Sequence, residues 1–161
     1  MIAVPTAAIL DSHELAFLVV ARRAILATID PDGRPRPVPI CFIVDAADPA
    51  RVRLITPLDD KPKAAADDKR ALARVRDIRA RPEVSVLVER WDEDWSRLGW
   101  LRLNGQATLL EPGDVPIDAV ERLRSKYPQY ATHALESSPM ISIDIERATS
   151  WGALDAASDP G

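Results

Sequence analysis

The chain has 161 residues, of which 47% are hydrophobic and 29% are charged, and its formal net charge is −4. This length fits one domain with a sizeable core, and the composition is that of a soluble globular protein. The acidic balance argues against a nucleic-acid binder, and no apolar run approaches the roughly 20 residues that span a membrane. We expect one cytoplasmic domain over residues 1–161, with its core at about 11–148 and a flexible tail at 150–161.

Side chains that commonly carry out chemistry are scarce in this chain. One cysteine, Cys41, allows no internal disulfide, and His13 and His133 are the only histidines, so the sequence predicts no metal site. No Ser/His/Asp or Cys/His arrangement and no glycine-rich phosphate loop is present. The pattern disfavours hydrolysis and leaves the catalytic residues unknown.

The spacing of apolar residues predicts six strands and three helices. Helices are expected at 11–23, 67–79 and 114–126. Strands are expected at 24–30, 34–45, 51–56, 84–89, 100–110 and 140–145, with a bulge at Gly105. A parallel sheet would need a crossover helix after nearly every strand, and the sequence has too few helices for that. The predicted fold class is therefore mainly β with α, and an antiparallel barrel is the natural closure.

Prolines occupy alternate positions of the second expected strand: Pro35, Pro37 and Pro39. N–H groups two residues apart point to the same side of a strand, so one edge loses three consecutive donors. That edge is either a free rim, protected against aggregation, or it faces a ligand. The other edge keeps the N–H groups of the residues in between, which can pair with a strand or donate to a heteroaromatic ring.

A basic segment stands out in this acidic chain. Residues 61–81 carry a net charge of +5, so the rest of the chain carries −9. Arginine suits phosphate because its planar fork offers two parallel hydrogen bonds. The cluster favours an anionic small ligand, and the alternative for any one arginine is a solvated charged surface.

Three of the four tryptophans, Trp91, Trp95 and Trp100, lie within ten residues of one another. Aromatic residues this dense in a polar loop complete a core or a dimer interface more often than they contact a ligand. For Trp95, which acidic residues and Ser96 flank, ligand contact is an equal alternative.

The segments LATIDPDGRPRPVP and IRARPEVSVLVE resemble the pyridoxamine 5'-phosphate oxidase-like split β-barrel superfamily, and the resemblance extends over about residues 21–110. The segment DEDWSRLGW is typical of a narrower group: it resembles the actinobacterial branch of coenzyme F420-dependent flavin and deazaflavin oxidoreductases. The resemblance implies a six-stranded antiparallel split β-barrel with flanking helices. It also implies a homodimer with cofactor clefts between its subunits.

The resemblance further implies which residues bind the cofactor. The strand at 36–40 would lie along the tricyclic ring, bases of the second helix would hold the phosphate, and aromatic residues would lie near the cleft or the dimer seam. The expected cofactor-binding residues are Arg36, Val38, Pro39, Ile40, Thr56, Lys61, Arg74, Arg76, Trp95 and Trp100. Asp77 departs from the asparagine that is common in relatives and puts a negative charge close to the expected phosphate site.

The resulting hypothesis is an oxidoreductase that passes hydride between coenzyme F420 and a small unsaturated or heteroaromatic organic substrate. The protein would contribute positioning and exclusion of water rather than acid–base chemistry. Two alternatives stay open. One is an FMN-dependent oxidoreductase of the same fold, and the other is a protein that binds a cofactor or another planar ligand without turnover.

Overall fold

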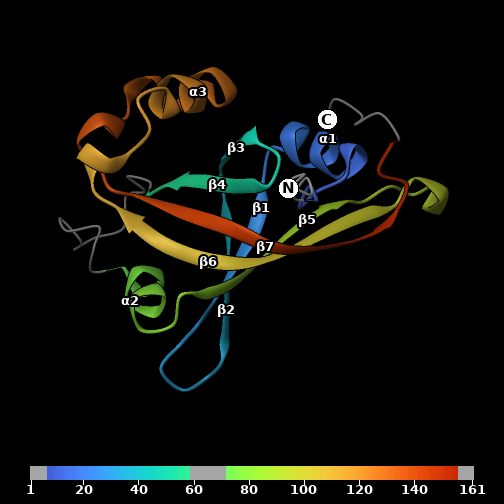
Figure 1. Ribbon diagram of the computed structural model, residues 1–161, viewed down its shortest axis with the longest axis horizontal. Helices are drawn as coiled ribbons and strands as arrows, with labels where there is room; N and C mark the ends of the chain where they lie inside the picture. The colour runs from blue at the N-terminus through green and yellow to red at the C-terminus, as the bar shows by residue number, and fades with distance from the viewer. Residues whose placement is uncertain (1–6, 59–71, 156–161) are drawn as a thin grey trace, which may run out of the picture.

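The computed structural model describes residues 7–58 and 72–155, and its main element is one curved antiparallel sheet (Figure 1). The strands are β1 Ala24–Ile29, β2 Pro35–Ile40, β3 Ile43–Asp48, β4 Arg51–Pro57, β5 Glu83–Arg90, β6 Gly99–Leu110 and β7 Met140–Gly152. The sheet order is β2-β1-β5-β6-β7-β4-β3. The helices are α1 Ser12–Val20, α2 Ala73–Ala80 and α3 Ala119–Lys126. Short 3-10 turns are η2 Trp95–Arg97, η3 Pro112–Asp114, η4 Pro128–Thr132 and η5 Leu135–Ser137.

The predicted fold class, mainly β with α in an antiparallel split barrel, is confirmed. The count of six strands and the closure of the barrel are wrong, because the second expected strand is two strands. The strand is interrupted at Cys41 and Phe42, between β2 and β3. These two strands form opposite edges of a seven-stranded sheet that is not closed. At the break, the hydroxyl of Tyr127 accepts from the Phe42 N–H at 3.0 Å and donates to the Phe42 carbonyl at 3.1 Å. A buried side chain therefore satisfies the peptide groups that a strand neighbour would otherwise satisfy.

The prolines lie on the outer strand of the sheet, as both interpretations of this edge require. β2 pairs only with β1 in this sheet, with Pro35, Pro37 and Pro39 opposite Ile29, Ala27 and Ile25. Proline has no N–H, so the hydrogen-bonded pairs of this ladder fall on the residues between the prolines. The outer edge of β2 therefore presents proline carbonyl groups and no N–H groups.

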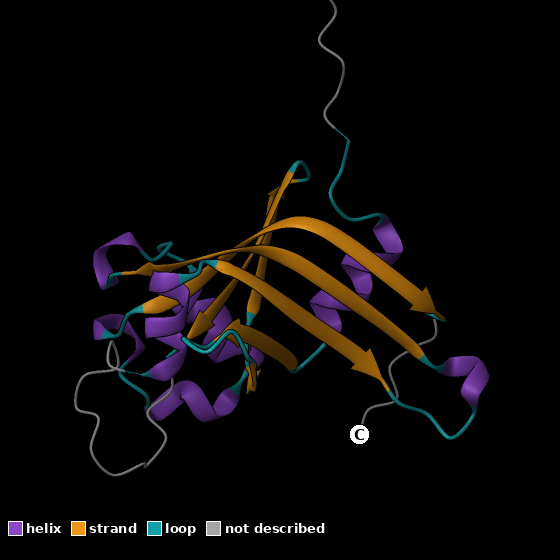
Figure 2. Ribbon diagram, turned by 90° about the horizontal axis from the view of Figure 1, so that it is seen from below, coloured by secondary structure: helices purple, strands orange, loops and turns teal. Residues whose placement is uncertain are grey.

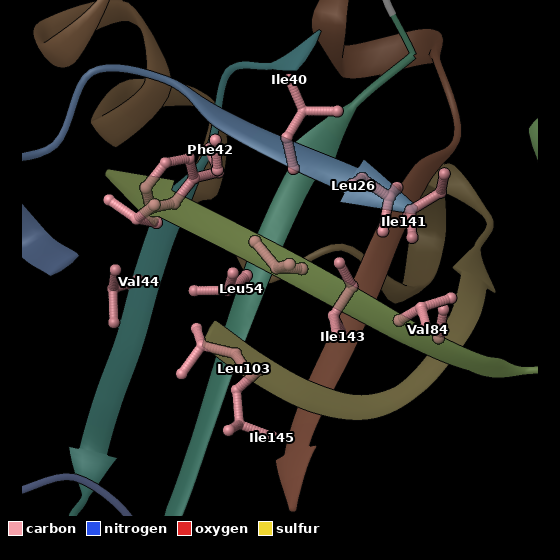
Figure 3. Packing of buried hydrophobic residues seen from close by; sticks show 14 of the residues in the cluster. Leu26, Ile40, Phe42, Val44, Leu54, Val84, Leu103, Ile141, Ile143 and Ile145 are labelled. Carbon is pink, nitrogen blue, oxygen red and sulfur yellow. The ribbon is translucent and has the colours of Figure 1, made fainter. Parts of the chain in front are cut away.

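The core lies on the concave side of the curved sheet (Figure 2), where buried side chains from several strands pack together (Figure 3). Strand β1 alternates between buried and half-buried residues over its whole length, and Leu26, Val86 and Leu103 are fully buried on three neighbouring strands. A smaller cluster forms where α3 and η4 cover the residues Ile43 and Ile55 of β3 and β4.

Gly105 lies at a bulge, as the sequence predicts. The register of β6 against β7 shifts between Asn104 and Gly105, and the extra residue, Glu146, is on β7. A Cβ on Gly105 would lie 2.1 Å from the carbonyl oxygen of Asp144. The glycine therefore allows the close backbone approach that the bulge requires.

The helices are shorter than expected. A capping box starts α1: the Asp11 side chain accepts from the N–H of Glu14, and the Glu14 side chain accepts from the N–H of Asp11. Helix α3 starts only at Ala119, after a 3-10 turn that begins at Pro112. The expected start of the second helix, at 67–71, lies outside the described residues. At the other end of the chain, β7 continues through Gly152, past the expected start of the tail.

Candidate functional site

A cleft of about 430 Å³ lies between α2 and the β1–β2 hairpin. Its size falls within the range of small-molecule sites. The residues that line it are Ile29, Asp30, Pro31, Arg36, Arg76, Asp77, Ala80 and Arg81. The lining includes three arginines and two aspartates, so the cleft carries one net positive charge.

Asp77 is the buried acid of this cleft, with a side chain that is 3% exposed. Its Oδ2 atom accepts from Nε of Arg36 at 2.8 Å and from Oγ1 of the fully buried Thr28 at 2.8 Å. A buried carboxylate needs both a cation and hydrogen bonds to offset its lost hydration. The interaction connects α2 with β1 and β2 and orients the Arg36 side chain along the cleft.

Arg76 and Arg81 supply the other positive charges. Both are exposed, and within the described ranges 7–58 and 72–155 neither has an ion-pair partner. Guanidinium groups without a carboxylate partner are suited to bind an anion from solution. The donors of this cleft therefore fit an anionic group such as a phosphate.

The turn between β1 and β2 forms the rim of the cleft. The side chain of Asp30 accepts from the N–H groups of Asp32 and Arg34 at 2.9 and 2.8 Å. Gly33 has φ of 81°, which favours glycine, and a Cβ there would lie 3.8 Å from Nη1 of Arg81. The Asp30 carboxylate therefore stabilises the turn, since one of its oxygens accepts both of these hydrogen bonds.

The structure brings two of the expected cofactor-binding residues into the cleft, Arg36 and Arg76. Arg74 lies on the same helix but does not line the cleft. On β2, Val38 is half-buried against the core, Ile40 is buried and Pro39 is exposed at the sheet edge.

The remaining expected residues lie elsewhere. Thr56 is buried in β4 opposite Ile141, and Lys61 lies outside the described residues. Trp95, in η2, is 72% exposed, and Trp100 lies opposite Trp151 where β6 pairs with β7. The η2 turn is at the opposite end of the sheet from α2 (Figure 1), so one chain does not bring these tryptophans to its own cleft.

Two residues of the cleft region, Thr28 and Arg81, were not among the expected site residues. Thr28 is the one polar residue on the inward side of β1, which otherwise reads Ala24 and Leu26. A lone polar residue in a buried alternation indicates a buried hydrogen-bond partner, and this signal is visible in the sequence. Arg81 follows α2 directly, and only the fold places it beside the hairpin turn.

Lys126 lies in a separate cavity of about 300 Å³, beside Val19 and Arg122. Its Nζ donates to the Phe42 carbonyl at 3.0 Å and lies 4.2 Å from the centre of the Phe42 ring. Burial, together with the positive charges of Arg22 and Arg122, lowers the pKa of Lys126 to about 8.

Metal ligands do not cluster in the described part of the chain: it holds no group of three or more His, Cys, Asp or Glu side chains that could bind an ion. Among the same residues, no helix has the length and apolar character needed to cross a membrane.

Solved structures with the same fold include proteins with and without stated function. The conserved hypothetical protein Rv2991 from Mycobacterium tuberculosis is 20% identical with a TM-score of 0.63, over 100% of this chain and 98% of that one. An F420 reductase is 18% identical with a TM-score of 0.57, over 83% and 94%. A FAD-binding protein from Mesorhizobium loti is 20% identical with a TM-score of 0.56, over 88% and 94%. At these identities the likeness shows the fold alone.

The sequence profile of the family described as pyridoxamine 5'-phosphate oxidase matches residues 10–152. Comparison with curated proteins gives no match. The matched range includes all seven strands, the three helices and the cleft between α2 and the β1–β2 hairpin. The chain therefore belongs to the pyridoxamine 5'-phosphate oxidase family.

Proposed function

We propose that this protein is an oxidoreductase that uses coenzyme F420 and reduces a small unsaturated or heteroaromatic substrate. The observation that carries the proposal is the cleft, where Arg36, Arg76 and Arg81 surround a space suited to an anionic group. In the proposed complex these arginines hold the cofactor's phosphate. The family and a structural neighbour that is an F420 reductase support a cofactor of the flavin or deazaflavin type.

The ring of the cofactor would lie along β2. The outer edge of β2 carries the carbonyl groups of Pro35, Pro37 and Pro39, which are acceptors for the N–H of a pyrimidine-type ring edge. The same edge cannot pair with another strand in a regular ladder, so it stays available to a ligand. When bound, the deazaflavin supplies hydride from its C5 position, and the protein positions the ring and excludes water.

A homodimer completes the proposed site. The η2 turn, which holds Trp95, and the start of β6, which holds Trp100, lie at the opposite end of the sheet from α2 (Figure 1). A second copy of the chain is therefore a source of aromatic side chains for the cleft. Trp91 and Trp151 are also exposed at the η2 end of the sheet, and exposed tryptophans are typical of interfaces.

Hydride exchange tests the activity. Reduced F420 with deuterium at C5 is mixed with the protein and a panel of enones, quinones and nitroaromatic compounds, and deuterium is followed by mass spectrometry. We expect deuterium in at least one product, and none with the Arg36→Ala/Arg76→Ala variant. F420 binding without transfer to any acceptor would favour a protein that only binds the cofactor. A yellow purified protein that reduces the same acceptors with FMN would favour the flavin alternative.

A further inference from the structure

Asp77 contributes one of the two negative charges that line the cleft. The carboxylate is buried, and its only cationic contact within the described residues is Arg36 at 2.8 Å. By formal charges the lining has one net positive charge, and a neutral residue at position 77 would leave two. Replacing Asp77 by a neutral residue would therefore change the charge of the cleft and leave the same arginines in its lining.

Phosphate groups differ in charge according to their number of ester bonds. A phosphomonoester carries about 1.5 to 2 negative charges at pH 7, because its second pKa is near 6. A phosphodiester has no second ionisable oxygen and carries one negative charge. A buried negative charge close to the site repels the monoester about twice as strongly as the diester.

We propose that Asp77 shifts the selectivity of this cleft from phosphomonoesters towards phosphodiesters. The inference deepens the proposed function and rests on it, since it takes the cleft as the place of the cofactor's phosphate. The side chain of coenzyme F420 is joined through a phosphodiester, whereas FMN ends in a phosphomonoester. Asp77 is then a specificity-determining residue that acts by its charge, and it shifts the selectivity of the cleft from FMN towards the deazaflavin.

The test uses two small probes without a ring, dimethyl phosphate and methyl phosphate, at about pH 8, where the second is a dianion. Binding to the wild-type protein and to Asp77→Asn is followed by the backbone amide NMR signals of α2 and β2. Asparagine keeps an oxygen that can accept from Thr28 and Arg36. We expect Asp77→Asn to gain about tenfold more affinity for methyl phosphate than for dimethyl phosphate, because the dianion feels the removed charge twice.

A second variant separates charge from structure. Arg36→Gln/Asp77→Asn removes one charge of each sign, so we expect the wild-type preference to return. Arg36→Gln alone lowers the charge of the cleft and should weaken methyl phosphate binding more than dimethyl phosphate binding. This variant provides the test if Asp77→Asn folds poorly. The inference is overturned if Asp77→Asn gains equal affinity for both probes or binds neither of them. It is also overturned if the double variant keeps the preference of Asp77→Asn.

The failure of the proposed function gives a different result. If the probe preferences change as expected but the wild-type protein binds neither F420 nor FMN, Asp77 sets the charge of the cleft and the cofactor assignment is wrong. If F420 binds and the probe preferences do not change, the cofactor assignment stands and the inference on Asp77 fails.

Discussion

Arg36 has two roles in this account, because it neutralises a buried acid and also lines the cleft. Its Nε donates to Asp77, which leaves the two terminal nitrogens of the guanidinium for other partners. Arg76 and Arg81 have no ion-pair partner within the described residues, so their charges are available to a ligand without breaking an existing pair. In the proposed complex, a few individual side chains therefore determine the strength of anion binding.

Arg76→Ala is expected to weaken F420 binding by at least about tenfold, because one charge-assisted contact contributes about 1.5 to 3 kcal/mol. The matched control is Arg79→Ala, on the same helix but outside the cleft lining. Isothermal titration of both variants checks this expectation. Equal affinities for the two variants would remove Arg76 from the site.

Lys126 predicts a pH dependence of stability. Its pKa is lowered from 10.5 to about 8 by burial, and then by Arg22 and Arg122. Between these values the unfolded chain holds a proton that the folded chain has released, so stability rises with pH in this window. The free energy of unfolding of the wild-type protein, relative to Lys126→Met, should rise on the order of 2 kcal/mol from about pH 8 to about pH 10.5. Urea denaturation of both proteins at several pH values checks this expectation. A difference in free energy of unfolding that stays constant across this window would contradict the lowered pKa of Lys126.

At the scale of elements, the bulge between β6 and β7 decides how the longest strands of the sheet pair. Gly105 faces the Asp144 carbonyl so closely that no side chain fits without a backbone shift. Gly105→Ala should therefore destabilise the protein by about 3 kcal/mol, as overpacking of a tight site does.

Gly113→Ala is the matched control, because nothing lies within 4 Å of the position that its Cβ would take. We expect its effect on the free energy of unfolding to be within about 0.5 kcal/mol. Chemical denaturation of both variants makes the comparison. A mild effect of Gly105→Ala would show that the strands can separate locally at the bulge.

Most strands were predictable from the sequence, because their alternation of apolar residues matches a sheet with one buried side. The break between β2 and β3 was not, since Tyr127, which satisfies the peptide groups of Phe42, is 85 positions away in the chain. The pairing of Asp77 with Arg36 was hidden for the same reason, because the two residues are 41 positions apart. Local patterns identify strands and turns, whereas such contacts exist only after folding.

For the site, composition and resemblance indicate a basic helix, and in the fold Arg76 of this helix lines the same cleft as Arg36. The departure at Asp77 takes on a different meaning in the structure. In the sequence it is an unpaired negative charge close to phosphate, and in the fold it is a buried carboxylate held by Arg36 and Thr28. Burial and pairing, rather than residue type, decide what this carboxylate does.

At the scale of the whole molecule, α2 and the η2 turn lie at opposite ends of one sheet (Figure 1), so the cleft beside α2 and the exposed Trp95 are separated within one chain. If the proposed dimer brings them together, cofactor binding should depend on protein concentration. We expect sedimentation to show a species of twice the chain mass of 17.7 kDa, and F420 affinity to fall on dilution below the dimer dissociation constant. A monomer that binds F420 with concentration-independent affinity would contradict the dimeric site.

The central claim is that the cleft between α2 and the β1–β2 hairpin holds the phosphate of a deazaflavin cofactor. Equilibrium titration of the wild-type protein with F420, and separately with FMN, tests it most directly. We expect micromolar binding of F420 and weaker binding of FMN, and Asp77→Asn should narrow this difference because its cleft carries one more net positive charge. Tight FMN binding with weak F420 binding, or binding of neither cofactor, would contradict it.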